Sequence, residues 1–334
     1  MIFVLALMVG APQVQKATIV FGGDLMLNQI PVKSKPLASI RPLLQSGDIA
    51  IANLEIPLTD SRRPTPYKST EELKARTQYI LKADPKHVTG IKESGIDIVS
   101  LGNNHVMDYG EDGLRQMTRL LTKHNIRFTG AGGNLTDAKR MVRSRPVALV
   151  SALAFMGTPA INKLGPATGD RAGLHALIFS GAIGKESHSY LKSWIAGQRE
   201  NNEIMVVGLH WGREKHTVPT PYQVALARAC IDAGADVVWG HHPHVLQGAE
   251  LYKGKPILYS MGNLISKKEG PTGLARIYFE NYKFNKFKFL PLDIKGMKVK
   301  PVKQMLVESR REQFRKLSQA IQLKFPHRES KPLY

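Results

Sequence analysis

The chain has 334 residues, of which 43% are apolar and 22% charged, a composition typical of a globular protein with a substantial core. Its one cysteine, Cys230, excludes a disulfide within the chain and a zinc site built from several thiolates. The net charge of +20 favours anionic partners. Nucleic acid is the least expected of these, because the sequence has no zinc-finger, recognition-helix or RNA-binding aromatic pattern.

The first residues resemble the apolar part of a secretory signal. Ile2 to Ala11 form an unbroken run of small and apolar residues that is too short to span a bilayer as a helix. No Lys or Arg precedes this run, and Pro12 makes a poor cleavage site, so a buried first strand is the alternative. We expect residues 1–17 to be an export segment, which implies a protein of the periplasm or cell surface.

Apolar runs that end in glycine or polar turns recur along the chain, and several are followed by helical patterns. This alternation predicts an α/β protein whose polar strand ends lie at the same edge of one sheet. The expected strands are 18–22, 48–52, 97–101, 147–155, 203–209, 236–239 and 257–259, and the expected helices are 113–124, 186–201 and 223–233.

Other segments depart from this alternation. Residues 61–86 predict an inserted loop and helix over the edge of the site, and residues 156–184 predict a long surface excursion. Residues 275–291 alternate like a hairpin, and residues 302–323 have the pattern of a closing amphipathic helix.

The end of the chain carries much of the positive charge. From residue 281 onward 14 Lys and Arg stand against 4 Asp and Glu, a net +10. We expect this basic region, within 275–334, to contact an anionic polymer or a membrane surface. A solvated basic face without a dedicated partner is the alternative.

Histidines gather directly after the apolar run 235–239, in the sequence Gly-His-His-Pro-His. Pro243 biases His242 toward an extended backbone, in which His242 and His244 project to the same side and can share one metal centre. A His-rich polar turn is the alternative.

Polar residues follow the other expected strands as well. Asp24 follows two glycines, and Glu55 follows a buried run, where glutamate is uncommon. Asn104, His105 and His210 also lie at strand ends. Turn formation by Asp24 and Asn104, or a satisfied core position for His210, is the local alternative in each case. Together, carboxylates, an amide and imidazoles predict a site for one or two divalent ions, Mn, Fe or Zn.

The charges of these groups indicate the kind of substrate. Two divalent ions bring four positive charges, whereas Asp24 and Glu55 supply two negative ones. The surplus favours an anionic, phosphorylated substrate. His105 is expected to act on that substrate and not on the metal, because its neighbour Asn104 points toward the metal and adjacent extended residues diverge.

Six motifs in one order resemble the poly-γ-glutamate capsule biosynthesis proteins (CapA type), relatives of the calcineurin-like metallophosphatases. The resemblance covers about residues 18–279, and it implies a metallophosphatase-like four-layer sandwich of two mixed β-sheets flanked by helices, in a domain of residues 18–334. The motifs are residues 23–27, 53–55, 102–110, 210–214, 240–247 and 259–263.

The resemblance also implies roles for the metal ligands and for the catalytic histidine. His105 assists catalysis as a proton donor, and Glu55 bridges the metals. The implied metal ligands are Asp24, Glu55, Asn104, His210, His242 and His244. The residues expected around the substrate at the rim are Asn53, Asn103, Asp108, His241, Ser260 and Asn263.

One motif departs from the metallophosphatase pattern. The first strand of those enzymes ends in Asp-x-His, whereas this chain has Asp24-Leu25-Met26. A thioether is a poor ligand for a hard divalent ion, so one of the two metal sites lacks a ligand.

The function implied is that of a metal-dependent hydrolase-like protein in capsule, poly-γ-glutamate or related surface-polymer biosynthesis. A metal-activated water would attack a phosphoester or related bond. The alternative is a non-catalytic polymer-binding or export component of a capsule-synthesis assembly.

Overall fold

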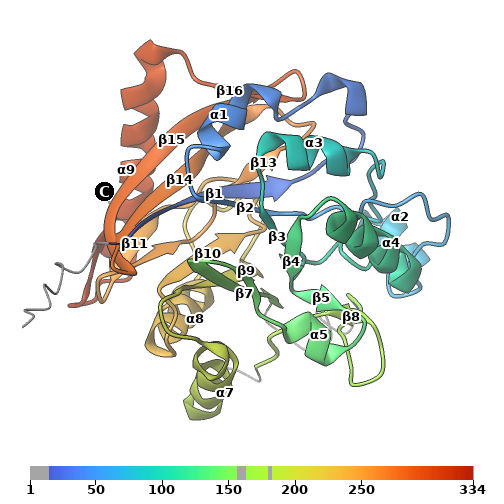
Figure 1. Ribbon diagram of the computed structural model, residues 1–334, viewed down its shortest axis with the longest axis horizontal. Coiled ribbons are helices and arrows are strands. Elements are labelled where there is room, and N and C mark those ends of the chain that lie inside the picture. The colour runs from blue at the N-terminus through green and yellow to red at the C-terminus, as the bar shows by residue number, and fades with distance from the viewer. Residues whose placement is uncertain (1–14, 156–162, 180–182, 334) are drawn as a thin grey trace, which may run out of the picture.

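The computed structural model describes residues 15–155, 163–179 and 183–333. Two large β-sheets pack against each other, and helices cover their outer faces (Figure 1). The first sheet has the strand order β16-β15-β14-β1-β2-β3-β4, with β13 beside β1, and the second has the order β17-β11-β12-β10-β9-β7-β6. Both sheets mix parallel and antiparallel pairs. This four-layer α/β architecture confirms the predicted fold class.

The strands of the first sheet are β1 (Lys16–Leu25), β2 (Ile49–Asn53), β3 (Ile98–Ser100), β4 (Arg127–Thr129), β13 (Asn263–Ile265), β14 (Gly270–Glu280), β15 (Lys283–Lys295) and β16 (Lys298–Pro301). Those of the second are β6 (Val142–Ser144), β7 (Val147–Ala154), β9 (Ile204–Trp211), β10 (Val237–His241), β11 (Ala249–Tyr252), β12 (Lys255–Leu258) and β17 (Ser330–Pro332). A small sheet pairs β5 (Ala131–Gly132) with β8 (Gly173–Leu174).

The helices are α1 (Arg41–Leu44), α2 (Thr70–Lys74), α3 (His87–Ser94), α4 (Gly110–Lys123), α5 (Leu135–Lys139), α7 (Lys185–Ile195), α8 (Pro221–Asp232) and α9 (Val307–Lys324). Short 3-10 turns are η1 (Val32–Ser34), η2 (Ala38–Ile40), η3 (Ala196–Gln198) and η4 (Gln304–Leu306). In the part of the chain that the structure describes, no helix has the length and apolarity needed to cross a membrane.

Two predicted segments fall partly outside the described residues. Most of the expected export segment, residues 1–14, lies there, and β1 begins at Lys16, within that segment's last residues. Of the expected excursion 156–184, residues 156–162 and 180–182 also lie outside.

A layer of apolar side chains joins the two sheets. Phe21 and Ile51 of the first sheet and Val206 and Trp239 of the second belong to one buried cluster. These central strands are buried on both faces, which explains why their sequences are almost continuously apolar. The indole Nε1 of Trp239 donates to the carbonyl oxygen of Gly22 at 2.9 Å, so β10 is fixed against β1 just before Asp24.

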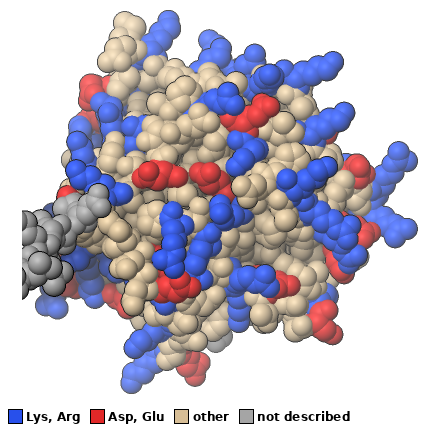
Figure 2. All heavy atoms as spheres, viewed as in Figure 1, with Lys and Arg blue, Asp and Glu red and all other residues tan. Residues whose placement is uncertain are grey.

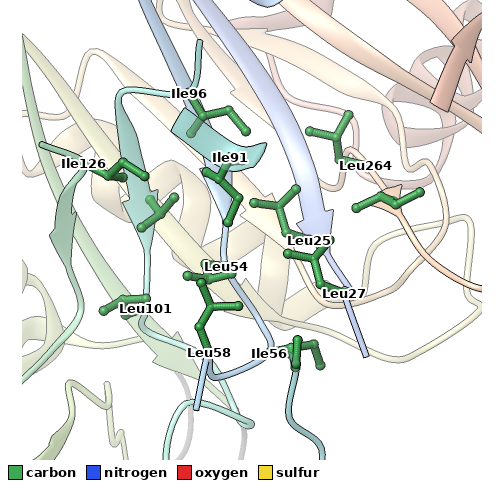
Figure 3. Packing of buried hydrophobic residues seen from close by; sticks show 14 of the residues in the cluster. Leu25, Leu27, Leu54, Ile56, Leu58, Ile91, Ile96, Leu101, Ile126 and Leu264 are labelled. Carbon is green, nitrogen blue, oxygen red and sulfur yellow. The ribbon is translucent and has the colours of Figure 1, made fainter. Parts of the chain in front are cut away.

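Helices bury the outer faces. One cluster covers the first sheet (Figure 3). It contains Leu25 of β1 together with Leu54 and Leu101, which directly follow β2 and β3, and these pack with Ile91 of α3 and with Ile126. A second cluster joins α7 and α8 to the outer face of the second sheet, below it in Figure 1.

Helix α9 closes one end of both sheets. The ring of Phe314 stacks on Phe289 of β15, with centroids 4.3 Å apart, and Ser318 Oγ accepts from the backbone N–H of Ala249 in β11 at 3.0 Å. The predicted hairpin is the longer pair β14–β15, and the predicted closing helix is α9.

The prediction that all polar strand ends belong to one sheet is wrong. Strands β1, β2 and β3 lie in the first sheet, whereas β9 and β10 lie in the second. At Gly102 the turn after β3 meets the second sheet so closely that a Cβ would lie 2.8 Å from backbone atoms of Ala152. Strands that alternate with helices have the same sequence pattern in one sheet as in two. The pattern therefore could not show that the strands belong to two sheets.

Acid is expected to destabilise the protein through His175. Its Nδ1 lies 3.2 Å from the Ser151 carbonyl oxygen, its Nε2 lies 3.0 Å from the Tyr190 hydroxyl, and burial lowers the pKa of His175 from 6.5 to about 3. The unfolded chain therefore takes up this proton near pH 6.5 and the folded chain does not. The free energy of unfolding is unaffected by His175 above that pH and falls as the pH drops toward 3, by at most about 5 kcal/mol at ~1.4 kcal/mol per pH unit.

Urea unfolding of metal-free protein between pH 8 and pH 4 measures this effect. The variant His175→Gln, which cannot titrate, should lose less stability below pH 6.5 than the parent. Parallel pH profiles for the two proteins would show that His175 is not the group responsible.

Candidate metal centre

The first sheet supplies two buried carboxylates, Asp24 and Glu55, both 0% exposed. A Cβ on Gly23 would lie 1.9 Å from the carbonyl oxygen of Gly262, so only glycine lets β1 approach that loop, where the Asp24 N–H donates to Gly262 at 2.9 Å. Asn53 Nδ2 donates to Asp24 Oδ1 at 2.8 Å and to Glu55 Oε2 at 3.4 Å. One amide thus orients both acids.

The second sheet supplies the imidazoles. His210 of β9 and His241 of β10 are register partners, and their Nδ1 atoms lie 2.9 Å apart. On its other side, His210 Nε2 lies 2.8 Å from Asn104 Oδ1 and 3.7 Å from Glu55 Oε1. His210 therefore meets the turn after β3 across the gap between the sheets.

His242 and His244 lie in the turn that follows β10. The expectation of an extended backbone is wrong, because φ is 102° at His242 and 58° at His244. Positive φ is strained for such residues and is found mainly where the surroundings enforce it, as at functional sites. The two rings are nevertheless close, with centroids 5.7 Å apart, because the turn bends both back toward the carboxylates.

His244 contacts both acids. Its Nδ1 lies 3.2 Å from Asp24 Oδ2 and 2.9 Å from Asn263 Oδ1, and its Nε2 lies 3.6 Å from Glu55 Oε1. The backbone N–H of His242 donates to Asp24 Oδ2 at 3.3 Å. The β10 turn is therefore attached directly to the end of β1.

Among the described residues the side chains form four overlapping groups of candidate ligands, one of which joins Asp24, His210 and His241, and two of which share Glu55. One atom from each of Asp24, Glu55 and His244 lies within 4.8 Å of the others, and the same holds for Glu55, His210 and His242. The amide oxygen of Asn104 adjoins the second group through His210. Two neighbouring cations bridged by Glu55 would fit this arrangement.

The electrostatics of the cluster also fit a cation. Among the described residues, the buried atoms Glu55 Oε1, His242 Nδ1 and His241 Nε2 have no hydrogen-bond partner. Burial raises the pKa of Glu55 well above its ordinary value; burial acts likewise on Asp24, but hydrogen bonding and attraction from His244 outweigh it and lower the pKa of Asp24. Burial lowers the pKa of His242 to about 3, which keeps this imidazole neutral.

The donor set consists of carboxylate and amide oxygens and imidazole nitrogens, which suits Mn, Fe or Zn. Buried polar atoms without a hydrogen-bond partner are costly in an apolar setting, and a cation would satisfy them. The residues present therefore fit a divalent metal, which would be held by Asp24, Glu55, Asn104, His210, His242 and His244.

His105 lies beside the ligand cluster and is held by Asp108. Its Nδ1 is 2.7 Å from Asp108 Oδ2, and it lines a cavity of about 670 Å³ together with His244 and Asn263. Burial lowers the pKa of His105, although Asp108 acts in the opposite direction. Within the described part of the chain, His105 joins none of the groups of three or more candidate ligands.

Two residues of the site were missed by the sequence analysis. The buried amine of Lys68 contacts Asp108 Oδ1 and donates to the backbone oxygens of Tyr79 at 2.8 Å and Asn104 at 3.3 Å. Glu214 lies within 4.8 Å of His242 and His244. Lys68 comes from the inserted segment 61–86, far along the chain from its partners, so no local pattern marks it; Glu214 belongs to the motif 210–214 but was given no role.

Most of the residues expected around the substrate are fully buried. Asn53, Asn103, Asp108, His241 and Ser260 are each 0% exposed. These five side chains are buried and contact other residues of the site, and His241 also joins Asp24 and His210 in a group of candidate ligands. Asn103, for example, donates to Asn53 Oδ1 at 3.2 Å and accepts from the backbone N–H of His105 at 3.2 Å. Asn263 is half-buried and does line the cavity.

Removing the Lys68 amine should be costly for stability. In Lys68→Met the buried Asp108 carboxylate loses its cation, and breaking a buried pair in this way costs roughly 3–5 kcal/mol. Urea unfolding at pH 7.5 measures the loss. Lys74→Met, at an exposed position of α2, is the matched control and should change stability by less than about 0.5 kcal/mol. A Lys68→Met variant as stable as this control would show that the pair contributes nothing.

Among solved structures, a protein described as a novel phosphatase from Mycoplasma pneumoniae superposes with a TM-score of 0.49 at 13% identity, covering 84% of this chain and 94% of its own. A likeness of this degree says nothing about activity. The four-layer architecture is assigned from the strand order and the helices of this structure alone.

The sequence is closer to capsule proteins. It is 29% identical over 294 residues to the PGA biosynthesis protein CapA of Bacillus subtilis (85% of this chain, 73% of the relative). It is 30% identical over 276 residues to the capsule biosynthesis protein CapA of Bacillus anthracis (81% and 64%). A probable polyglutamine synthesis accessory protein of Mycobacterium tuberculosis is 28% identical over 232 residues (68% and 57%). The alignments thus span about two thirds of the relatives' length. Residues 18–268 match the family described as bacterial capsule synthesis protein PGA_cap, and the chain belongs to that family.

Proposed function

We propose that this chain is a metal-dependent hydrolase that cleaves a phosphoester or related bond in capsule, poly-γ-glutamate or related surface-polymer biosynthesis. The observation that carries the proposal is the pair of ligand groups sharing Glu55, next to a buried His105–Asp108 pair that faces a cavity. Family membership supplies the biosynthetic setting. An exported location, predicted from residues 1–17, is part of the proposal.

The residues of the site would divide the work as follows. Asp24, Glu55, Asn104, His210, His242 and His244 would hold the metal. A divalent cation bound there would polarise a phosphoryl oxygen and lower the pKa of a bound water. Asp108 holds the Nδ1 side of His105, which leaves Nε2 as the atom that transfers a proton to the leaving group. The ring of Phe155, 4.7 Å from that of His242, shields one side of the ligands from water.

The cavity fits an anionic substrate. Lys215, Lys267, Lys268 and Arg310 line it along with His105 and His244. Lys267 donates to Gln29 Oε1 at 2.8 Å and Arg310 pairs with Asp293 at 3.1 Å. Among the described residues, the amines of Lys215 and Lys268 have no hydrogen-bond or ion-pair partner. They remain available to a phosphate or carboxylate that enters beside the metal.

A phosphoester panel tests this function. Protein stripped with EDTA would be assayed with p-nitrophenyl phosphate and bis-p-nitrophenyl phosphate, with Mn, Fe or Zn added back. We expect hydrolysis of at least one ester that depends on metal. Protein that binds metal stoichiometrically but cleaves neither ester nor a phosphorylated glycan would contradict the enzymatic function.

The second candidate function is a non-catalytic polymer-binding or export component of a capsule-synthesis assembly. Two observations favour it: the methionine at position 26 and the net +10 of residues 281–334. On the face shown in Figure 2, Lys and Arg side chains extend into solvent across much of the surface, with fewer Asp and Glu among them. Such a surface attracts polyanions and anionic lipid in a salt-dependent way.

Lysines of the β15–α9 region should carry this contact. Arg310, Arg311 and Arg315 engage Asp293, Glu308 and Glu312, whereas exposed Lys298, Lys300 and Lys303 have no ion-pair partner among the described residues. Replacing these three lysines with Gln should weaken binding to poly-γ-glutamate or anionic vesicles several-fold.

Co-sedimentation at 0.1 M and 1 M salt measures that binding. Parent binding should fall steeply with salt, because the screening length shortens from about 10 Å to 3 Å over this range. The matched control replaces Lys123, Lys185 and Lys192, exposed lysines of α4 and α7, with Gln. Equal loss in the two triple variants would show that only overall charge matters and that the region has no dedicated partner.

A further inference from the structure

The sequence at the end of β1 leaves one metal position short of a ligand. Asp24, Glu55 and His244 form one candidate group, and Met26 stands where the metallophosphatases have a histidine. Met26 is half-buried and lines the same cavity as His244 and Glu214. Because a thioether binds hard divalent ions poorly, an oxygen or nitrogen donor from elsewhere is needed to complete this position.

The loop after β9 brings a carboxylate to this place. The chain turns at Gly212, where φ is 84°, and at Lys215, where φ is 64°. The backbone N–H of Lys215 donates to the carbonyl oxygen of Pro243 at 2.8 Å, which attaches the loop to the turn that carries His242 and His244. A carboxylate oxygen of Glu214 consequently lies within 4.8 Å of a ring nitrogen of each histidine.

Among the described residues, no hydrogen bond or ion pair accounts for the position of this carboxylate. Across residues 15–155, 163–179 and 183–333, the Glu214 side chain has no ion pair and no hydrogen bond, although the neighbouring backbone is fixed at both Gly212 and Lys215. Glu214 also differs from Glu269, another acid of the same cavity, whose Oε1 accepts from the backbone N–H of Gly296 at 2.8 Å. Glu214 is thus an exposed acid without a hydrogen bond, beside two candidate ligands, and its charge acts on one of them, His244.

We propose that Glu214 is a metal ligand, which joins His244 on the ion that Asp24 and Glu55 hold and so replaces the histidine missing at position 26. This inference rests on the proposed metal-dependent function. It also changes the charge of the centre: three carboxylates oppose the four charges of two divalent ions, and the surplus that remains for an anionic substrate or bound water falls from two to one.

Metal titration of four proteins tests the proposal. Isothermal titration and Mn²⁺ EPR of EDTA-stripped parent, Glu214→Gln, Met26→His and the double variant report affinity without any assay of activity. Glu214→Gln should weaken one Mn²⁺ step at least ~10–100-fold, the range known for losing a supporting partner of a metal ligand. The double variant should regain most of this affinity, because the new histidine supplies the missing donor. The matched control Glu269→Gln should bind as the parent does.

The outcomes separate this inference from the function on which it rests. If Glu214→Gln binds Mn²⁺ at every step as tightly as the parent, Glu214 is not a ligand, and the rest of the centre stands. If affinity falls but Met26→His does not restore it, the two side chains do not serve the same position and the inference fails in that form. A parent protein that binds no Mn²⁺, Fe²⁺ or Zn²⁺ would instead remove the proposed function itself.

Discussion

Asp24→Asn is expected to lower the affinity for divalent metal by more than about 100-fold, and any metal-dependent hydrolysis should fall with it. The change keeps the shape of the side chain but removes the charge of a carboxylate that is fully buried and lies against His244, Asn53 and the His242 N–H. A direct ligand should matter more than the outer partners of ligands, whose loss already costs roughly 10–100-fold. Metal content after dialysis, measured by plasma mass spectrometry, gives the result.

Asp60→Asn provides the control for that experiment, since Asp60 is exposed and belongs to none of the candidate ligand groups. Its metal content should equal that of the parent. Retention of stoichiometric metal by Asp24→Asn would mean that the end of β1 does not bind the ion.

His105→Ala should lower hydrolysis without lowering metal affinity, unlike Asp24→Asn. Metal content is expected to stay at the parent level, because His105 contacts Asp108 and the cavity and joins no ligand group in the described chain. Hydrolysis should fall roughly 10²–10⁴-fold, the usual contribution of a general acid. The measurement is kcat on an alkyl phosphate ester, whose leaving group needs a proton, with metal saturating.

The same experiment contains its own check. Esters with a nitrophenolate leaving group need little protonation, so the loss in His105→Ala should be smaller for them than for alkyl esters. Loss of metal from His105→Ala would show that the residue is a ligand, and equal losses on both kinds of ester would argue against proton transfer to the leaving group.

The strands of the central layers could be predicted because their signal is local. The apolar run 147–155 became β7 (Val147–Ala154), and the run 203–209 became β9 (Ile204–Trp211). A strand buried on both faces requires apolar residues at every position, and the polar residue that ends it marks the point where the chain leaves the core. Candidate ligands at strand ends could be found for the same reason.

Other features depend on contacts between distant segments. The assignment of β9 and β10 to a second sheet, the positive φ of His242 and the approach of Lys68 to Asp108 are all set by packing across the molecule. The burial of the polar residues could not be predicted either: Asn53 and His241 were expected at the rim, but both side chains are fully buried. The sequence pattern predicts where strands end. Packing between distant segments determines which of the polar groups there contact metal, substrate or the core.

Anomalous diffraction from crystals grown with Mn²⁺ tests the central claim most directly. We expect anomalous density bounded by Asp24, Glu55 and His244, by Glu55, His210 and His242, or by both groups at once. Ordered Asp24 and Glu55 side chains with no anomalous density between them at millimolar Mn²⁺ would contradict the assignment of this cluster as a metal centre.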